Sequence, residues 1–451
     1  MQGSVVVPPK PCVDACKDCS YQCTQKIVPV PTVGEALDMW LDGICFSNVE
    51  TETVELSDAL NRVSAAPVYA KFDIPAANCA MHDGIAVCRA HCEDKFASGN
   101  HTLLPDAFRH CPMGSVIPEQ FDSIAHAEQC CLNDDGTATL FQLPVLYQSV
   151  QLKGASIAGG EKLMEADEKL SPSHLAILQY TGHTAVRVKR RPRIAVIPVG
   201  DDLKAPGEVP APGQSIDCDS IYVRATALQC GAEAMVSRLV PDDGAAIAEA
   251  IRRELPTCDI LVVIGGVGKG EHRYGDHTVA AVREMGRISC YGVLLGPGGK
   301  NLLLASVEGK PVLGIPGPPH AAIIMTEYFL PPIIEHWLGC PCYERQTVEA
   351  TLAEDFPTRG GGKSIWEPRL RLEMTGQGYS ARIVERMGDT VDNFINAAAS
   401  VAVTGDPAQF KAGGKVRVKL LYGERTIAAK SLRQLKSHGT AETGTSPNKG
   451  E

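Results

Sequence analysis

The sequence predicts a multidomain α/β protein with a central parallel sheet and helices on both of its faces. A β-rich insertion domain and a C-terminal β-barrel accompany that core. Strand-like and helix-like segments alternate from 193 to 338, as they do in parallel sheets covered by helices. Residues 73–146 contain many short strand-like segments and no long helical pattern. Residues 343–424 alternate polar and apolar positions over short stretches. Both patterns are typical of small β-domains.

Two helices outside the central region carry clear start signals. Residues 32–46 have an amphipathic pattern, with Thr32 as N-cap and Glu35 completing a capping box. Residues 169–190 resemble a helix, a glycine stop and a strand. The cap, the first helical proline and the stop are Ser171, Pro172 and Gly182.

The central alternation is regular over about 140 residues. Its third strand is a continuous apolar run, as buried parallel strands have. The helix that precedes this strand begins with acidic residues, which suit a helix N-terminus. In order, the expected elements are strand 193–199, helix 220–232, strand 233–240, helix 242–255, strand 259–267, helix 276–286, strand 310–317 and helix 318–330.

These patterns divide the chain into six regions. We expect a Cys-rich flexible extension at 1–31, a linking domain at 32–72 and 147–190, a β-rich insertion domain at 73–146, an α/β domain at 191–338, a β-barrel at 339–424 and a disordered tail at 425–451.

Composition narrows the class of protein. The chain has 451 residues and a formal net charge of −10, which argues against a nucleic-acid-binding or anionic-membrane surface. The start lacks the pattern of a signal peptide, and apolar runs are too short for a membrane span. The odd count of 17 scattered cysteines favours reduced thiols in the cytoplasm.

Three loops at the ends of central strands predict a ligand crevice. They read VGDDL at 199–203, IGGVGKGE at 264–271 and GIPGPPH at 314–320. The carboxyl ends of parallel strands meet at one edge, glycines let the backbone approach an anion, and the acids of the first loop are suitable ligands for a divalent cation. The second loop matches neither a phosphate-binding loop nor a dinucleotide fingerprint. Taken singly, each glycine could simply make a tight turn.

Several motifs together resemble the molybdopterin molybdenumtransferase family, which includes the E domain of gephyrin. The resemblance covers about residues 32–424, and the order and spacing of the motifs carry it. The matching stretches are DIPAANCAMHDGIAV, LSPSHLAILQYTGHTAVRVKRRPRIAV, RIAVIPVGDDL, PGQSIDCDS, VPDD, IGGVGKGE and GKPVLGIPGPP.

The resemblance implies a function and a fold. Members of the family insert molybdate into adenylylated molybdopterin and release AMP, with Mg²⁺ as the divalent cation. The implied fold is a homodimer of four-domain chains in which the α/β domain binds the pterin. The implied partners are adenylylated molybdopterin, molybdate and an acceptor molybdoenzyme.

The resemblance also assigns site residues. The catalytic candidates are Asp83, Asp202, Asp242 and Glu271. The substrate-binding candidates are Gly200, Asp201, Asp217, Gly265, Gly266, Val267, Gly268, Lys269, Gly270, Arg273, Pro316 and Gly317. The Mg²⁺ ligand candidates are Asp202, Asp242, Glu271 and Asp276. Each catalytic acid also has a structural interpretation: Asp242 as a helix cap, Asp202 and Asp83 as turn residues, and Glu271 as a solvated side chain.

Departures from the family pattern concentrate in the site. The replaced positions are Met113, Ser156, Arg273, Gly296, Gly299 and Pro318, and the two glycines stand where lysines are usual. One hypothesis is a rewired loop, in which Lys269 and Arg273 hold the anion while Glu271 or Asp276 holds the cation. The alternative function is a non-catalytic paralogue that binds molybdopterin or a related nucleotide-pterin as a carrier, scaffold or regulator.

The first region holds four closely spaced cysteines. Their spacing suits one Zn²⁺ or an iron–sulfur cluster, and the alternative is a flexible thiol-rich tail. The four are Cys12, Cys16, Cys19 and Cys23.

Overall fold

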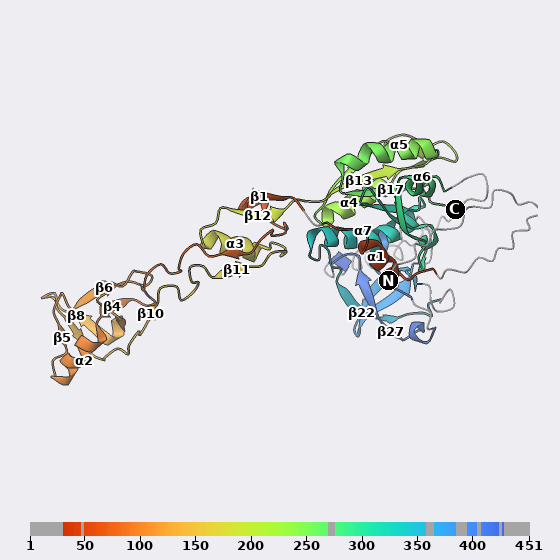
Figure 1. The fold of residues 1–451 in the computed structure, drawn as a ribbon. Coiled ribbons are helices and arrows are strands. Elements are labelled where there is room, and N and C mark those ends of the chain that lie inside the picture. Colours follow the sequence, from red (N-terminus) through yellow and green to blue (C-terminus); the bar gives the residue numbers. More distant parts are fainter. Residues whose placement is uncertain are drawn as a thin grey trace, which may run out of the picture. The chain divides into compact units, whose positions relative to one another are not determined.

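The computed structural model describes most of the chain. The described residues are 30–46, 49–268, 276–357, 365–384, 395–403, 407–423 and 426–427. The chain divides into two compact units, Met1–Val49 with Arg191–Glu451 as one and Glu50–Arg190 as the other (Figure 1). Among the described helices, none is long and apolar enough to cross a membrane.

The first unit is built on a six-stranded sheet. Its strand order is β16 (Glu233–Val236), β13 (Arg193–Pro198), β17 (Ile260–Ile264), β21 (Lys310–Ile315), β20 (Leu303–Val307) and β18 (Gly286–Tyr291). The first four strands are parallel to one another. All five residues of β17 are buried, because helices cover both sides of this central strand.

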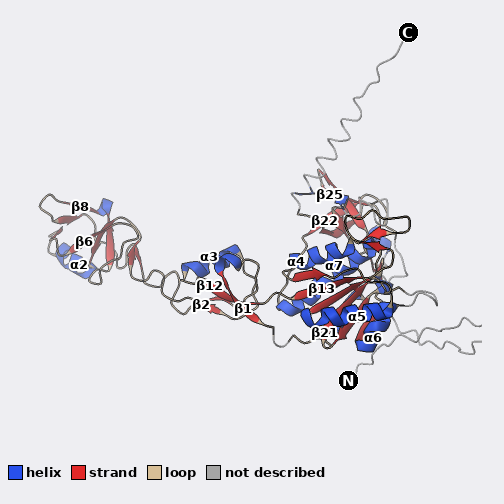
Figure 2. Ribbon diagram, turned by 90° about the horizontal axis from the view of Figure 1, so that it is seen from above, coloured by secondary structure: helices blue, strands red, loops and turns tan. Residues whose placement is uncertain are grey.

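Helices cover both faces of the sheet, as predicted. Figure 2 shows α4 (Asp219–Gln229) and α7 (Pro319–Leu338) on one face, with α5 (Gly244–Glu254) and α6 (His277–Met285) on the other. Ile247 and Ile251 of α5 and Val282 of α6 are fully buried against strand residues such as Val263. The α/β architecture predicted from the alternation is therefore confirmed.

The sheet is mixed, whereas the sequence predicted a parallel one. Strand β20 pairs with β21 in antiparallel orientation, and β18 pairs with β20 in antiparallel orientation at the edge of the sheet. Both strands lie between two segments that had been expected to follow each other directly. Strand β18 starts with two exposed residues, and its register shifts between Ile288 and Cys290. An edge strand of this kind lacks the continuous apolar run or strict alternation that marks a strand in sequence.

Helix α1 (Val33–Leu41) has the predicted capping box between Thr32 and Glu35. The prediction that placed it in the linking domain of 32–72 is wrong. Its fully buried Trp40 donates from Nε1 to the carbonyl oxygen of Ala305 on β20 at 2.8 Å, and the helix also contacts α7 and β18. Because this apolar face is covered by the sheet unit, residues 30–46 belong there.

The C-terminal region is a closed barrel, as predicted. Its strand order is β22 (Thr347–Leu352), β25 (Gly378–Ile383), β24 (Arg369–Thr375), β26 (Ala399–Ser400) and β27 (Lys415–Leu420). A short pair joins β19 (Leu295–Gly296) to β23 (Ile365–Trp366). Ile427 is buried in the barrel core, so the folded region extends past the predicted start of the tail at 425.

The second unit contains two groups of elements with separate cores. The first group comprises β1 (Thr51–Glu55), η1 (Leu56–Asp58), β2 (Val68–Tyr69), β11 (Lys162–Met164), α3 (Pro172–Tyr180) and β12 (Ala185–Lys189). The second comprises β3 (Cys79–Ala80), β4 (Gly84–Val87), α2 (Arg89–Ala97), β5 (Thr102–Leu103), β6 (Phe108–Cys111), β7 (Ser123–His126), η2 (Ala127–Gln129), β8 (Cys130–Leu132), β9 (Ala138–Leu140) and β10 (Val150–Gln151). Ser171 caps α3 and Pro172 begins it, as predicted.

Candidate active site

The predicted crevice forms where β13, β17 and β21 end. The N–H of Gly265 donates to the carbonyl oxygen of Ile315 at 3.0 Å, so the ends of β17 and β21 are joined. The N–H of Val199 donates to Ile264 at 2.8 Å, which joins the end of β13 to the same edge. A methyl group on Gly317 would lie 3.8 Å from the Cα atom of Gly265. The three loops therefore meet at one place, as the parallel topology requires.

Glycine is required at two positions of the second loop. Gly265 has φ +95°, and a Cβ atom there would lie 2.3 Å from the carbonyl oxygen of Val199. Gly266 has φ +63°, and a Cβ atom there would lie 2.5 Å from Thr278 Oγ1. The Gly265 N–H is already used within the sheet edge, so amide contacts to a phosphate must start at Gly266. Gly265 was predicted to bind substrate, and its own amide is not available for that role.

Helix α6 is tied to this loop by Thr278. Its hydroxyl donates to the carbonyl oxygen of Gly265, and its backbone N–H donates to that of Gly266, both at 3.0 Å. These bonds place the N-terminal end of α6 beside the loop, where its dipole favours an anion. Sequence reasoning missed Thr278, although a threonine in the first turn of the helix after a Gly-rich loop was the available signal.

Three aspartates come together beside the loop. The N–H of Asp242 donates to Asp201 Oδ1 at 3.1 Å, and Ser215 Oγ donates to Asp202 Oδ2 at 3.4 Å. Asp242 Oδ1 is buried and has no hydrogen-bond partner among the described residues. A Cβ atom on Gly266 would lie 3.2 Å from that oxygen, so it faces the loop.

The Asp242 carboxylate is electrostatically unfavourable where it stands. Burial raises its pKa above the usual value. The imidazole of His277 works in the opposite direction, whereas the negative charges of Asp201 and Asp202 raise the pKa further. A partly desolvated carboxylate with one oxygen that lacks a donor in the described part of the chain is an arrangement that a cation would stabilise.

Adjacent Asp243, and not Asp242, caps helix α5. The Asp243 carboxylate accepts from the N–H groups of Ala245 and Ala246 at 3.0 and 2.9 Å. The structural interpretation of Asp242 as the cap is therefore wrong. Because Asp243 caps the helix, the Asp242 side chain is available to the crevice.

Replacing Asp243 tests whether this residue acts only as the helix cap. We expect Asp243→Ala to lower the free energy of unfolding by about 1 kcal/mol, because two N–H groups lose their acceptor. Catalytic turnover should stay within about twofold of the parent, since this side chain points into the helix. Thermal unfolding and a product-release assay measure the two quantities, and a collapse of turnover without loss of stability would contradict the assignment.

Asp276 lies at the start of α6 and is held by Tyr291 of β18. The tyrosine hydroxyl lies 2.8 Å from Asp276 Oδ2 and 3.1 Å from the carbonyl oxygen of Val267, so it links the carboxylate to the loop. Burial and the neighbouring carboxylate raise the pKa of Tyr291, which keeps the hydroxyl protonated. Tyr291 belongs to the strand that the sequence did not reveal, so it was not predicted as a site residue.

We expect Tyr291→Phe to lower the free energy of unfolding by about 1–2 kcal/mol, because a buried carboxylate loses a donor. The KM for the substrate should rise severalfold, because the loop loses this hydrogen bond. Exposed Tyr180→Phe serves as the control and should change neither value. Thermal unfolding and steady-state kinetics give the comparison, and an unchanged KM would show that the loop is held by other contacts.

The remaining predicted residues are distributed as follows. Asp217 Oδ1 accepts from the N–H of Ser220 at 3.1 Å and so helps to cap α4. Asp83 belongs to the second unit, where it accepts from the N–H of Met113 at 2.8 Å. The predicted site residues that lie outside the described part of the chain are Cys12, Cys16, Cys19, Cys23, Lys269, Gly270, Glu271 and Arg273. The rewired-loop and N-terminal metal hypotheses therefore stay predictions.

Gly299 explains one departure from the family pattern. A Cβ atom there would lie 2.7 Å from the carbonyl oxygen of Val293 and 2.9 Å from its side chain. Any side chain at this position would force the backbone to shift, so a lysine does not fit in this local structure. Lys300, the neighbouring cation, is exposed.

The carboxylates fit a cation that is shared with a substrate. Within the described part of the chain, no cluster of three or more histidine, cysteine or acidic side chains is arranged to hold a metal ion alone. Mg²⁺, however, is often held by one or two carboxylates together with substrate phosphates and water. The unpartnered Asp242 oxygen and neighbouring Asp202 supply donors of that kind.

Fold and crevice together define the class of protein, an α/β protein with attached β-domains and a candidate ligand site at the carboxyl edge of its sheet. The family model "MoeA N-terminal region (domain I and II)" matches residues 31–182, and the model "Probable molybdopterin binding domain" matches residues 195–336. The chain belongs to the molybdopterin molybdenumtransferase family.

Individual relatives agree with this assignment. The molybdopterin molybdenumtransferase of Staphylococcus aureus (strain MSSA476) is 25% identical over 392 residues, covering 83% of this chain and 92% of the relative. That of a Nostoc species is 28% identical over 327 residues, covering 68% and 74%. The fold is shared with the crystal structure of the molybdopterin biosynthesis MoeA protein from Pyrococcus horikosii, which has a TM-score of 0.75 at 24% identity and covers 88% of this chain and 100% of that one.

Proposed function

We propose that the chain inserts molybdate into adenylylated molybdopterin and releases AMP, and that the crevice at the ends of β13, β17 and β21 is the site. The observation that carries the assignment of the site is the buried Oδ1 atom of Asp242, which has no hydrogen-bond partner among the described residues and faces the Gly-rich loop beside Asp201 and Asp202. Membership of the transferase family supports the reaction.

Each part of the crevice has a task in this reaction. The amide groups from Gly266 onward and the N-terminal end of α6 would bind the phosphates of the substrate. Asp202 and Asp242 would hold Mg²⁺, which polarises the phosphoryl oxygens and offsets their charge. Positioning these groups near one another is the main contribution of the protein.

The proposal also covers the cellular compartment, the oligomeric state and the N-terminal cysteines. We place the enzyme in the cytoplasm, because none of the 13 cysteines in the described residues forms a disulfide. We also propose a homodimer that passes its product to an acceptor molybdoenzyme. For Cys12, Cys16, Cys19 and Cys23, metal analysis of anaerobically purified protein should find about one Zn²⁺ or one iron–sulfur cluster per chain.

The proposal is tested with purified protein, adenylylated molybdopterin and Mg²⁺. We expect AMP release on addition of molybdate, and little or none with sulfate or without an oxyanion. Tungstate is nearly isosteric with molybdate and serves as the specificity comparison. Tight binding of the pterin with no AMP release under any of these conditions would contradict the proposal and would favour the carrier or regulatory paralogue.

A further inference from the structure

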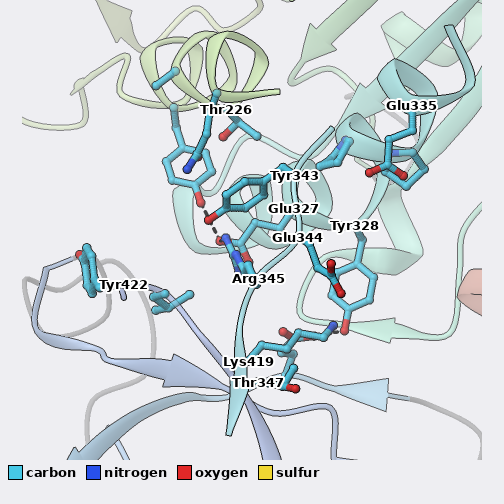
Figure 3. Close-up of a pocket in the computed structure, with 17 residues that line it drawn as sticks. Thr226, Glu327, Tyr328, Glu335, Tyr343, Glu344, Arg345, Thr347, Lys419 and Tyr422 are labelled. Atoms are coloured by element: carbon cyan, nitrogen blue, oxygen red, sulfur yellow. Dashed lines mark hydrogen bonds and ion pairs between the residues drawn. The ribbon is translucent and has the colours of Figure 1, made fainter. Parts of the chain in front are cut away.

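A second cavity lies away from the crevice, between the α/β core and the barrel of the same unit. It has a volume of about 630 Å³ and contains none of the crevice residues. Its walls come from α4, α7, the segment at 343–347 and the end of β27. We call it the tyrosine pocket, after Tyr222, Tyr328, Tyr343 and Tyr422, which line it (Figure 3).

Two of the tyrosine rings are held in place by their hydroxyls. Tyr222 donates to Glu327 Oε1 at 2.6 Å, and Tyr328 donates to Glu367. Because both hydroxyls are used inside the protein, the rings are fixed as part of the wall. Pro331 and Pro332 of α7 add further apolar surface. A wall of fixed rings loses little entropy when a ligand binds.

The charges inside the pocket are paired with neighbouring groups. Glu327 is paired with Arg345 and Arg369 at 2.7 and 2.9 Å. Lys419 Nζ lies 4.9 Å from the centre of the Tyr328 ring.

The rim of the pocket is acidic. Glu344 is exposed at the edge, and Glu335 also lines the pocket. A basic group on a ligand is therefore favoured at this rim.

Apolar grooves lined by aromatic rings recognise proline-rich segments in the polyproline II conformation, because the prolines are already ordered before binding. This chain contains a proline-rich sequence at residues 5–11, VVVPPKP. It combines three prolines with Lys10, and the first acidic residue of the chain is Asp14. Its composition therefore complements both the rings and the acidic rim.

The segment is tethered within reach of the pocket. The carbonyl oxygen of Pro31 accepts from the N–H of Leu294 in the same unit, so the chain is anchored there. The residues between Pro11 and Val30 span up to about 60 Å when extended. A compact unit of this size has a radius of gyration of about 20 Å, so its surface is accessible to the tether.

We propose that residues 5–11 of this chain bind its own tyrosine pocket. The prolines pack against the tyrosine rings, and Lys10 lies toward Glu344 and Glu335. This contact is independent of the crevice and of the proposed reaction.

The test measures competition for the pocket in the full-length chain. A fluorescent peptide of residues 4–11 is titrated with the parent and with a triple variant, Pro8→Ala, Pro9→Ala and Pro11→Ala. A tethered segment has an effective concentration of about 1 mM. If the peptide binds with a Kd of about 0.1 mM, we expect it to bind the triple variant about tenfold more tightly than the parent.

Two further substitutions in the triple variant locate the binding site. Glu344→Lys reverses a charge at the exposed rim and should weaken peptide binding severalfold, whereas Glu249→Lys on the exposed side of α5 should not. Equal affinity for the parent and the triple variant would overturn the proposal. So would binding that is insensitive to Glu344→Lys, or a difference between parent and triple variant that disappears on dilution, since a second copy would then supply the segment.

Discussion

Replacing Asp242 by asparagine will lower AMP release by at least about 100-fold and will raise the thermal stability of the α/β unit at neutral pH. The loss is of the size seen when one preorganised charge-stabilising group is removed from an active site. The gain in stability arises because the carboxylate is partly buried beside two other aspartates and its Oδ1 atom lacks a partner among the described residues. Asparagine removes the charge and keeps the shape.

The pH dependence of this effect has a definite sign. Burial raises the pKa of Asp242 in the folded state, so between the unfolded value near 3.8 and the higher folded value the folded chain binds more protons. Stability therefore falls as pH rises through that window, and the full cost remains at pH 7. The difference in melting temperature between Asp242→Asn and the parent should be positive at pH 7 and narrow toward pH 4.

The matched control is Asp243→Asn on the neighbouring residue. Asparagine is also a good N-cap, so this variant should keep both stability and turnover near those of the parent. AMP release and thermal unfolding across pH measure both variants. If Asp242→Asn retains more than about a third of the parent activity, or melts at a lower temperature, the role assigned to Asp242 is wrong.

Glu327→Gln will lower the free energy of unfolding of the first unit by about 3–5 kcal/mol. Glu327 Oε1 accepts from Tyr222 at 2.6 Å, Arg345 at 2.7 Å and Arg369 at 2.9 Å. The side chains of Glu327 and Arg369 are only 6% and 4% exposed. Glutamine removes the negative charge and leaves the two guanidinium groups buried without their counterion. An uncompensated buried charge lowers the free energy of unfolding strongly.

The same network predicts a loss of stability in acid. Burial alone would raise the pKa of Glu327, but Arg369 and Arg345 outweigh it and lower the pKa to about 2. A lowered folded-state pKa means that the contribution is present above the unfolded value near 4.5 and is lost as pH falls from there toward 2. The Gln variant should lack this part of the acid dependence.

Tryptophan fluorescence follows this unit selectively, because Trp40, Trp337 and Trp366 all belong to it. Denaturant unfolding of the parent and Glu327→Gln gives the difference in free energy. Glu344→Gln, on the exposed rim of the same pocket, should change the value by less than about 0.5 kcal/mol. Equal unfolding midpoints for the parent and Glu327→Gln would show that the ion-pair network contributes no net stability.

Much of the fold could be predicted because its signals are local. The apolar runs of β13 and β17 and the cap of α1 at Thr32 are each contained in a few residues. What α1 packs against could not be predicted, because an amphipathic face does not specify its partner. Strand β18 was missed for a similar reason, since an irregular edge strand has a weak pattern.

The candidate site was predicted in part. Parallel topology was enough to bring the loops after β13, β17 and β21 together. Two adjacent aspartates at 242 and 243 give no indication in sequence of which one caps the helix and which one faces the crevice. Tyr291 and the tyrosine pocket depend on contacts between distant segments, and such contacts leave no trace in the local pattern.

The most direct test of the central claim is the ratio of cofactor formed to AMP released in a single turnover. Cofactor would be measured by reconstitution of an apo-molybdoenzyme and AMP by chromatography, with adenylylated molybdopterin, molybdate and Mg²⁺ supplied to the parent chain. An insertion reaction predicts one cofactor for each AMP, with both lost together in Asp242→Asn. AMP released without cofactor would show simple hydrolysis of the nucleotide, and the account of the crevice as a molybdate-inserting site would be contradicted.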